Sequence, residues 1–223
     1  AICDALPVAR DLRRRIKARL GRCVHHIACS RYFYYYSYLR PRVGDYDEIM
    51  LTDVRDVIFQ ADPFTVPLTA PLRFFIEHPS MTVGGQINNA LWVGNAYGHP
   101  VLAKIADRPV SCSGITYGTA TGMLDYLAAM TDELTALTRK VAGGIGYDQG
   151  VHNYLIWHHR FPRAEIMENT AGPVLTLQAV PADEISVDSS GRLLDRNGAV
   201  VPVLHQYDRH PGHRDRLRSL LAG

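Results

Sequence analysis

Residues 48–64, which join a short apolar run to two aspartates, constrain the fold of this chain more than any other segment. The run 49–51, Ile-Met-Leu, is long enough for a buried β-strand and too short for a helix. Asp53 and Asp56 follow directly, and Pro63 stops the segment because proline restricts the residue before it and cannot continue a strand ladder. Ligands of open α/β sheets bind beyond the strand ends, so both carboxylates stand where a ligand would bind.

Two carboxylates in that position have two interpretations. Carboxylate oxygens are preferred ligands of hard cations such as Mg²⁺ and Mn²⁺. Such a cation can hold a diphosphate that Asp53 and Asp56 would otherwise repel. The alternative is structural: Asp53 caps a turn and Asp56 pairs with Arg55 on the surface. This segment alone leaves both interpretations open.

Length and composition indicate one domain. The 223 residues and the hydrophobic content of 47% fit a single domain, 1–223, whose core is large enough to need no disulfide bonds. The formal net charge of +2 does not indicate a nucleic-acid-binding protein, so we expect no nucleic acid partner. The cysteines, at positions 3, 23, 29 and 112, form no CxxC pair and fit no zinc module. We therefore expect reduced thiols and a cytoplasmic location.

The hydropathy pattern does not predict a membrane protein. No stretch is apolar and long enough to span a bilayer, and no signal peptide is visible. Arginines cluster in residues 13–15 and 214–218, where a solvated helix face is the first interpretation and peripheral membrane binding is the alternative. We expect no transmembrane segment.

Periodicity and turn residues predict alternating helices and strands along the chain. A tyrosine-rich segment, 30–39, is expected to be a helix with Ser30 as its N-cap and with Tyr32, Tyr35, Tyr36 and Leu39 on its core face. The other predicted helices are 11–20, one entered from the loop at 84–86, 123–137, 148–157 and 214–221. The other predicted strands are 24–27, 72–76 (ending at Glu77), 110–118 and 200–204, with turns at 189–191 and 196–198.

Two further segments place polar residues where a ligand could bind. Ser113 and Gly114 lie within a β-prone run, where glycine often marks close approach of a ligand, although a tight strand-to-helix corner is the alternative. Asp148 stands where an N-cap is expected, so Asp148 and Gln149 would point at whatever the strand ends surround. The glycines at 143–146 fit neither a dinucleotide-binding nor a phosphate-loop motif.

His205 follows the last apolar strand. A lone histidine in that position is usually structural, and it becomes a candidate metal ligand only if the fold brings it close to Asp53 and Asp56. The neighbouring histidines 25 and 26 would point to opposite faces of a strand, so they are poor joint ligands.

The order and spacing of short motifs between Arg31 and Pro211 resemble those of nucleotide-sugar glycosyltransferases with the GT-A fold, in particular the family-eight-like retaining group. The segment 51–56, Leu-Thr-Asp-Val-Arg-Asp, is similar to the strand-ending DxD metal motif, although its acids are spaced DxxD. The other matching motifs are Cys-Ser-Gly-Ile at 112–115, Asp148-Gln149 with Asn153 at a helix start, and His205, which resembles the late histidine of the metal site.

The resemblance implies a fold and a set of roles. The fold would be α/β, a Rossmann-like central mixed sheet flanked by helices, with a C-terminal β-hairpin region. The family begins with a nucleotide-binding strand that we cannot place in residues 1–30. The metal, Mn²⁺ or Mg²⁺, would be held by Asp53, Asp56 and His205, and Gln149 and Asp148 would be catalytic. The implied donor-binding residues are Arg31, Asp53, Arg55, Ser113, Gly114, Asp148 and Asn153.

The implied reaction transfers a sugar from a nucleoside diphosphate sugar to a hydroxyl acceptor, a glycan or a small molecule, with retention of configuration. An inverting enzyme would need a carboxylate base, for which Asp148 and Glu77 are the candidates. Two other functions stay open: nucleotidyl transfer to a sugar phosphate, for which no glycine-rich loop with lysine is visible, and non-catalytic binding of a nucleotide sugar by the same fold.

Overall fold

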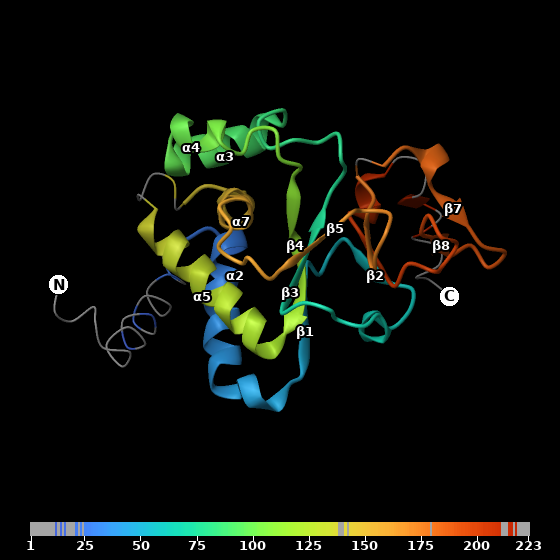
Figure 1. Cartoon of the computed structure of the whole chain (residues 1–223), viewed down its shortest axis with the longest axis horizontal. Helices are drawn as coiled ribbons and strands as arrows, with labels where there is room; N and C mark the ends of the chain where they lie inside the picture. Colours follow the sequence, from blue (N-terminus) through green and yellow to red (C-terminus); the bar gives the residue numbers. More distant parts are fainter. Residues whose placement is uncertain are drawn as a thin grey trace.

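A four-stranded mixed sheet lies at the centre of the molecule (Figure 1), in a computed structural model that describes residues 25–137, 141, 143–178 and 180–210 and isolated positions near both ends. Its strand order is β1-β4-β3-β5. Strand β4 runs antiparallel to both neighbours, and β5 runs parallel to β3. The strands are β1 (Glu48–Thr52), β3 (Leu72–Ile76), β4 (Ser111–Thr119) and β5 (Glu165–Met167).

Helices cover one face of this sheet. The helices α2 (Ile27–Leu39), α5 (Ala120–Ala136) and α7 (Tyr147–Trp157) pack together there, to the left of the strands in Figure 1. Leu72 and Phe74 of β3 are buried against them. At the top of the view, helix α3 (Ile87–Tyr97) lies next to α7, and helix α4 (His99–Ala103) lies next to α3. Short 3-10 helices occur at Arg40–Asp45, Pro63–Thr65, Ala182–Glu184 and Tyr207–Arg209.

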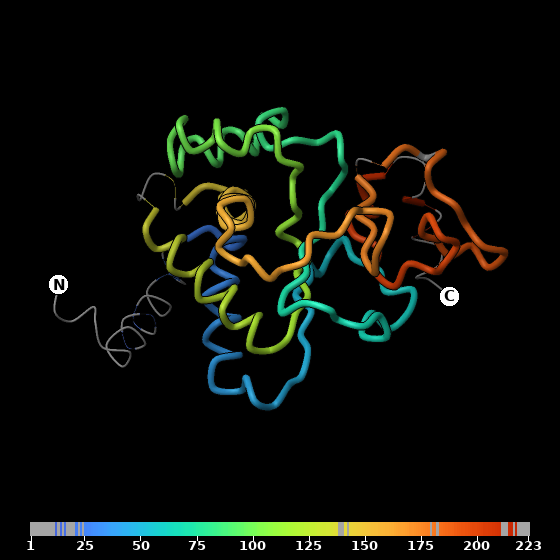
Figure 2. The backbone as a smooth tube through the Cα atoms, in the orientation of Figure 1, coloured from blue at the N-terminus to red at the C-terminus, as the bar shows by residue number. Residues whose placement is uncertain are grey.

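A second, three-stranded sheet covers the other face. Figure 2 shows the chain leaving the first sheet after β1, entering the second sheet and returning through β3. Phe75, Ile115 and Tyr117 of the first sheet are buried against Val174 and Val203 of the second. The second sheet has the order β2-β9-β6 and comprises β2 (Val57–Phe59), β6 (Val174–Thr176) and β9 (Val203–His205), while β7 (Ser186–Val187) and β8 (Leu193–Leu194) form a hairpin beyond it.

The predicted α/β class with a central mixed sheet and a C-terminal hairpin is therefore confirmed in its coarse form. The prediction that helices flank the sheet is wrong for one face, because a sheet packs there instead. The predicted helices 11–20 and 214–221 lie outside the described residues, apart from isolated positions.

Strand β1 lies at the edge of the sheet, and this corrects the prediction of a buried strand. Ile49 and Leu51 pack toward the helices and Met50 toward the second sheet, so apolar side chains occupy both faces. All five residues of β1 are nevertheless only half-buried, because β4 is the one strand that pairs with it in the described part of the chain. The last predicted strand is also displaced: β9 includes His205 and begins at Val203.

The two helix starts differ from the predicted ones. Helix α2 begins at Ile27, so the strand predicted at 24–27 is absent in its described residues, and His26 is the N-cap, with its Nδ1 accepting a hydrogen bond from the Ala28 amide at 3.3 Å. Ser30 lies inside the helix rather than at its start. Helix α7 is capped by Gly146, whose φ of +84° favours glycine, and Asp148 lies in the first helical turn.

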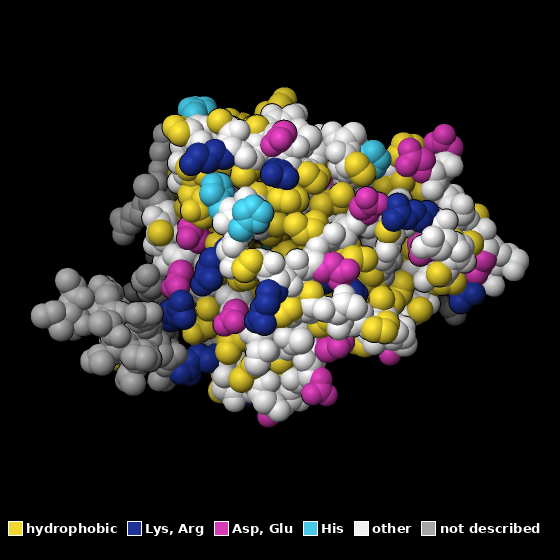
Figure 3. All heavy atoms as spheres, viewed as in Figure 1, with side chains coloured by type: hydrophobic (Ala, Val, Ile, Leu, Met, Phe, Trp, Pro, Cys, Tyr) yellow, Lys and Arg dark blue, Asp and Glu magenta, His cyan; other side chains and the backbone are white. Residues whose placement is uncertain are grey.

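The tyrosine face predicted for α2 is confirmed, because Tyr32, Tyr36 and Leu39 are buried in the helical core and Tyr35 packs against it. No helix in the described part of the chain is long and apolar enough to cross a membrane. On the face shown in Figure 3, basic and acidic side chains are interspersed rather than gathered by sign.

Candidate metal centre and adjoining cavity

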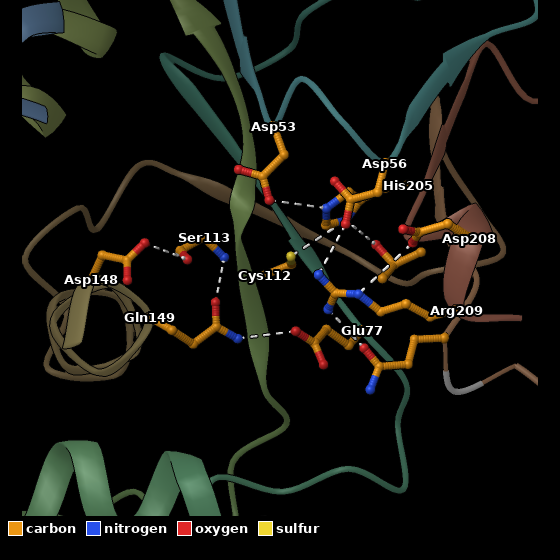
Figure 4. A network of polar contacts seen from close by, with 12 residues as sticks. Asp53, Asp56, Glu77, Cys112, Ser113, Asp148, Gln149, His205, Asp208 and Arg209 are labelled. Carbon is orange, nitrogen blue, oxygen red and sulfur yellow. Dashed lines mark hydrogen bonds and ion pairs between the residues drawn. The ribbon is translucent and has the colours of Figure 1, made fainter. Parts of the chain in front are cut away.

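Asp53, Asp56 and His205 come together where the two sheets meet (Figure 4). Asp53 follows β1 and Asp56 precedes β2, so the turn between those strands carries both carboxylates. The antiparallel register of β2 and β9 pairs Val57 with His205, which places the imidazole beside Asp56. Potential ligand atoms of the three residues all lie within 4.8 Å of one another.

The imidazole of His205 is completely buried, and its surroundings fix its orientation. Its Nδ1 lies 3.5 Å from the Cys112 Sγ and 3.4 Å from the Thr176 Oγ1. Its Nε2 lies 3.5 Å from the Asp53 Oδ2 and has no hydrogen-bond partner among the described residues. When Nδ1 carries the proton and donates it to Thr176, the Nε2 lone pair is free to ligate a cation.

Gly114 keeps the space in front of these two atoms open. A Cβ atom at this position would lie 2.7 Å from the Asp53 Oδ2 and 2.8 Å from the His205 Nε2, which is closer than real Cβ contacts. Two carboxylates and an imidazole form a donor set that suits a borderline cation such as Mn²⁺. The unpaired nitrogen and the glycine together fit a cation site.

Two arginines already pair with the carboxylates. Arg31 forms an ion pair with the Asp53 Oδ1 and a second with the Asp148 Oδ2 at 2.9 Å. The Arg209 Nη2 donates to the Asp56 Oδ2 at 3.0 Å. Burial alone would raise the pKa of Asp53, but contact with His205 and the charge of Arg31 outweigh it and hold that pKa at about 2. Asp53 is therefore ionised at neutral pH, as a metal ligand must be.

The start of α7 faces β4 through a chain of hydrogen bonds. The Ser113 amide donates to the Gln149 Oε1 at 2.7 Å, and the Gln149 Nε2 donates to the Glu77 Oε1 at 3.0 Å (Figure 4). The Ser113 hydroxyl lies 3.5 Å from the Asp148 Oδ2. Burial raises the pKa of Glu77 above its ordinary value. The Gln149 amide is thus held on both sides, with its orientation set by its partners.

A cavity of about 330 Å³ lies between these walls. The predicted site residues Arg31, Asp53, Ser113, Gly114, Asp148 and Gln149 line it. Asp56 and His205 are buried beside Asp53 and do not line it. The sequence prediction assigned no role to several other lining residues: Met81, Gln86, Asn88, Asn89, Trp92, Gln178, Gln206 and Arg209.

Two predicted donor-binding residues lie elsewhere. Asn153 is completely buried, where its Oδ1 accepts from the Ser111 amide at 2.8 Å and its Nδ2 donates to the Ser111 carbonyl at 2.9 Å. Asn153 therefore ties α7 to β4 and does not reach the cavity. Arg55 is exposed and is not part of the cavity lining.

Comparison with known proteins adds no assignment to this geometry. No protein-family model matches the chain, and no curated protein matches it.

Proposed function

We propose that this chain is a metal-dependent glycosyltransferase that moves a sugar from a nucleoside diphosphate sugar to a hydroxyl acceptor. One observation carries the proposal: His205, far from Asp53 and Asp56 in sequence, has a potential ligand atom within 4.8 Å of theirs, and Asp53 also lines a polar cavity. Asp148 and Gln149, which the resemblance to the GT-A fold associates with the donor sugar, line the same cavity.

Residues of the chain would bind the cation and position the carboxylates. Asp53, Asp56 and His205 would hold the cation, which when bound would offset charge on the diphosphate and on the departing nucleoside diphosphate. Arg31, already paired with Asp53 and Asp148, fixes both carboxylates relative to each other. Gly114 leaves the space beside these ligand atoms open, because a Cβ atom there would lie 2.7 Å from the Asp53 Oδ2 and 2.8 Å from the His205 Nε2.

Asp148 and Gln149 would act on the sugar. The Asp148 carboxylate can accept hydrogen bonds from sugar hydroxyls, and its position in the first turn of α7 places it at the cavity. The Gln149 oxygen already accepts from the Ser113 amide and has a second lone pair for the cavity. Because Glu77 and Ser113 hold this amide in place, it can stabilise developing positive charge at the reacting carbon without reorganising.

The proposed reaction does not require a protein side chain as a base. The acceptor oxygen forms a bond to the anomeric carbon as the bond from that carbon to the phosphate oxygen breaks. The phosphate keeps the electron pair of the broken bond and takes the acceptor's hydroxyl proton. The resemblance implies retention of configuration; an inverting reaction would instead use Glu77 or Asp148 as base.

Incubation with labelled nucleoside diphosphate hexoses such as UDP-glucose and GDP-mannose, with Mn²⁺ or with EDTA, tests the proposal. We expect Mn²⁺-dependent release or transfer of the sugar, lost in Asp53→Asn. Asp62→Asn is the matched control, because Asp62 is exposed and its Oδ1 caps a 3-10 helix, a role that asparagine also fills. Exchange of pyrophosphate would identify a nucleotidyltransferase instead, and binding without turnover a non-catalytic binding protein.

A further inference from the structure

Part of the cavity wall is not used by the proposed metal chemistry. Neutral amide side chains dominate it: Gln86, Asn88 and Asn89 at the start of α3, with Gln178 and Gln206 from the second sheet's loops. An amide offers one acceptor and two donors and carries no charge. The group that this wall can bind is therefore neutral and rich in hydrogen-bonding atoms.

Asn89 has hydrogen-bonding capacity that the fold leaves unused. It lies in the first turn of α3 and is only 7% exposed. Its Oδ1 has no hydrogen-bond partner in the described part of the chain. Buried polar atoms are nearly always paired, so the Asn89 Oδ1 retains the capacity to accept a hydrogen bond from a group bound in the cavity.

Gln206 shows the same property with a strained backbone. Its φ of +55° and ψ of +33° lie in the left-handed region, which residues other than glycine rarely adopt. The residue is 6% exposed, and its Oε1 is also unpaired among the described residues. Strained conformations of this kind cluster at ligand sites, where the surrounding structure imposes them. Here the strain accompanies an amide at the cavity wall, directly after the candidate metal ligand His205.

Trp92 adds an apolar surface to the same wall. Its indole is half-buried against the start of α7, where a Cβ atom at Gly146 would lie 2.1 Å from the Trp92 Cζ2. The absence of a side chain at Gly146 therefore leaves space for the Trp92 ring. Trp92 and Asn89 both line the cavity. An aromatic ring next to amides offers an apolar face for the C–H side of a pyranose and hydrogen bonds for its hydroxyls.

We propose that Asn89, Gln206 and Trp92 form a subsite for the hydroxyl groups of a saccharide. The unpaired atoms are carbonyl oxygens, which accept from hydroxyls and repel the oxygens of phosphate or carboxylate. The subsite deepens the proposed function, on which it rests, by naming the ligand class for this wall. The saccharide can be the sugar of the donor or the acceptor, because both present the same hydroxyl chemistry.

Saturation-transfer NMR with methyl glucoside, methyl galactoside, methyl mannoside and lactose tests the subsite without nucleotide or turnover. We expect at least one of these to receive saturation from the parent protein, and its affinity to fall at least fivefold in Asn89→Ala and in Gln206→Asn. Asparagine tolerates the left-handed backbone of position 206 but does not reach as far. Asn95→Ala is the matched control, because Asn95 lies on the same helix and bonds the Tyr147 hydroxyl at 3.2 Å outside the cavity lining.

Titrations with UDP and UDP-glucose, or GDP and GDP-mannose, in Mn²⁺ separate the two sources. Loss of affinity for the nucleotide sugar but not for the nucleotide identifies the donor sugar, and a raised acceptor KM alone identifies the acceptor. Thermal unfolding of each variant checks its fold, and Asn89→Ser replaces Asn89→Ala if the latter unfolds.

Two results would overturn the subsite. The first is that no saccharide receives saturation and the nucleotide sugar binds no more tightly than the nucleotide. The second is that folded Asn89 and Gln206 variants bind saccharides like the parent. A wrong proposed function gives a different result from a wrong subsite. The protein would then still bind saccharides but would bind no nucleoside diphosphate.

Discussion

The Nε2 of His205 lies 3.5 Å from the Oδ2 of Asp53, although the two residues belong to segments of different sheets. The contact depends on the pairing of β2 with β9, because this pairing places His205 of β9 beside the turn between β1 and β2 that carries Asp53. The His205 Nε2 has no hydrogen bond among the described residues. A cation between them would satisfy both atoms.

Removal of one ligand should therefore weaken Mn²⁺-dependent binding of a nucleoside diphosphate. We expect His205→Gln and Asp53→Asn each to raise the Kd for UDP or GDP in Mn²⁺ at least tenfold, because even the neighbours of metal ligands contribute about 10–100-fold. The effects should be non-additive in the double variant, since both residues would serve one ion. Isothermal titration with and without Mn²⁺ measures this.

The control for these variants is His99→Ala, at an exposed position of α4. Equal affinity of the parent and folded His205→Gln in Mn²⁺ would show that His205 is purely structural. Glutamine is chosen because His205 is completely buried, so that its side-chain volume contributes to packing. Truncation to alanine would leave a cavity and cost on the order of 2 kcal/mol of stability.

The sequence was sufficient to identify Asp53, Asp56 and His205 as candidate metal ligands, because each is a polar residue where an apolar strand stops or starts. It could not show that β1 lies at the edge of its sheet, since the run 49–51 is apolar on both faces and reads as a central strand. Which strands pair is set by tertiary packing.

The sequence did not predict the amide side chains that line the cavity, such as Asn89 and Gln206, for a different reason. A single asparagine or glutamine produces no periodic signal, and the left-handed backbone of Gln206 cannot be read from its neighbours. Asn153 shows the opposite error, because a residue matched by motif spacing proved to be a buried link between α7 and β4. Motif spacing locates a segment, whereas the direction of each side chain depends on where the helix begins.

Gln149→Ala should lower kcat by about 100-fold and leave the Kd of the nucleotide sugar nearly unchanged. The Gln149 amide is oriented by Ser113 and Glu77, so its contribution would be made chiefly in the transition state. Steady-state kinetics at saturating donor, with the donor Kd from titration, measure the two quantities separately. A proportional loss of donor affinity would place Gln149 in ground-state binding instead.

His152 should make the fold sensitive to moderate acid. Its Nδ1 lies 2.7 Å from the Tyr126 hydroxyl and its Nε2 lies 3.0 Å from the Ser111 Oγ, and both nitrogens are buried. Burial, with a smaller effect of the Arg31 charge, lowers the pKa of His152 to about 3, whereas the unfolded value is near 6.5. The stabilising effect of the neutral imidazole is thus complete above pH 6.5 and is lost as the pH falls toward 3.

The free energy of unfolding should fall by about 1.4 kcal/mol per pH unit below pH 6.5 from this residue alone, or on the order of 2 kcal/mol at pH 5. Urea unfolding at pH 7, 6 and 5 measures the slope. His152→Gln should flatten it, and His99→Ala should keep it. An unchanged slope in folded His152→Gln would assign the acid sensitivity to other groups.

Gly114→Ala provides the sharpest test of the cation site, because it adds a single methyl group between the candidate ligand atoms. That carbon would lie 2.7 Å from the Asp53 Oδ2 and 2.8 Å from the His205 Nε2, so one of them has to move. We expect Mn²⁺-dependent nucleotide binding to weaken at least tenfold, with a stability cost of about 1–3 kcal/mol from overpacking.

Gly44→Ala is the matched control, since nothing lies within 4 Å of a Cβ atom there. Titration with UDP or GDP, with and without Mn²⁺, separates loss of the cation from loss of the fold. If folded Gly114→Ala binds nucleotide in Mn²⁺ as tightly as Gly44→Ala does, the cation does not lie between Asp53 and His205.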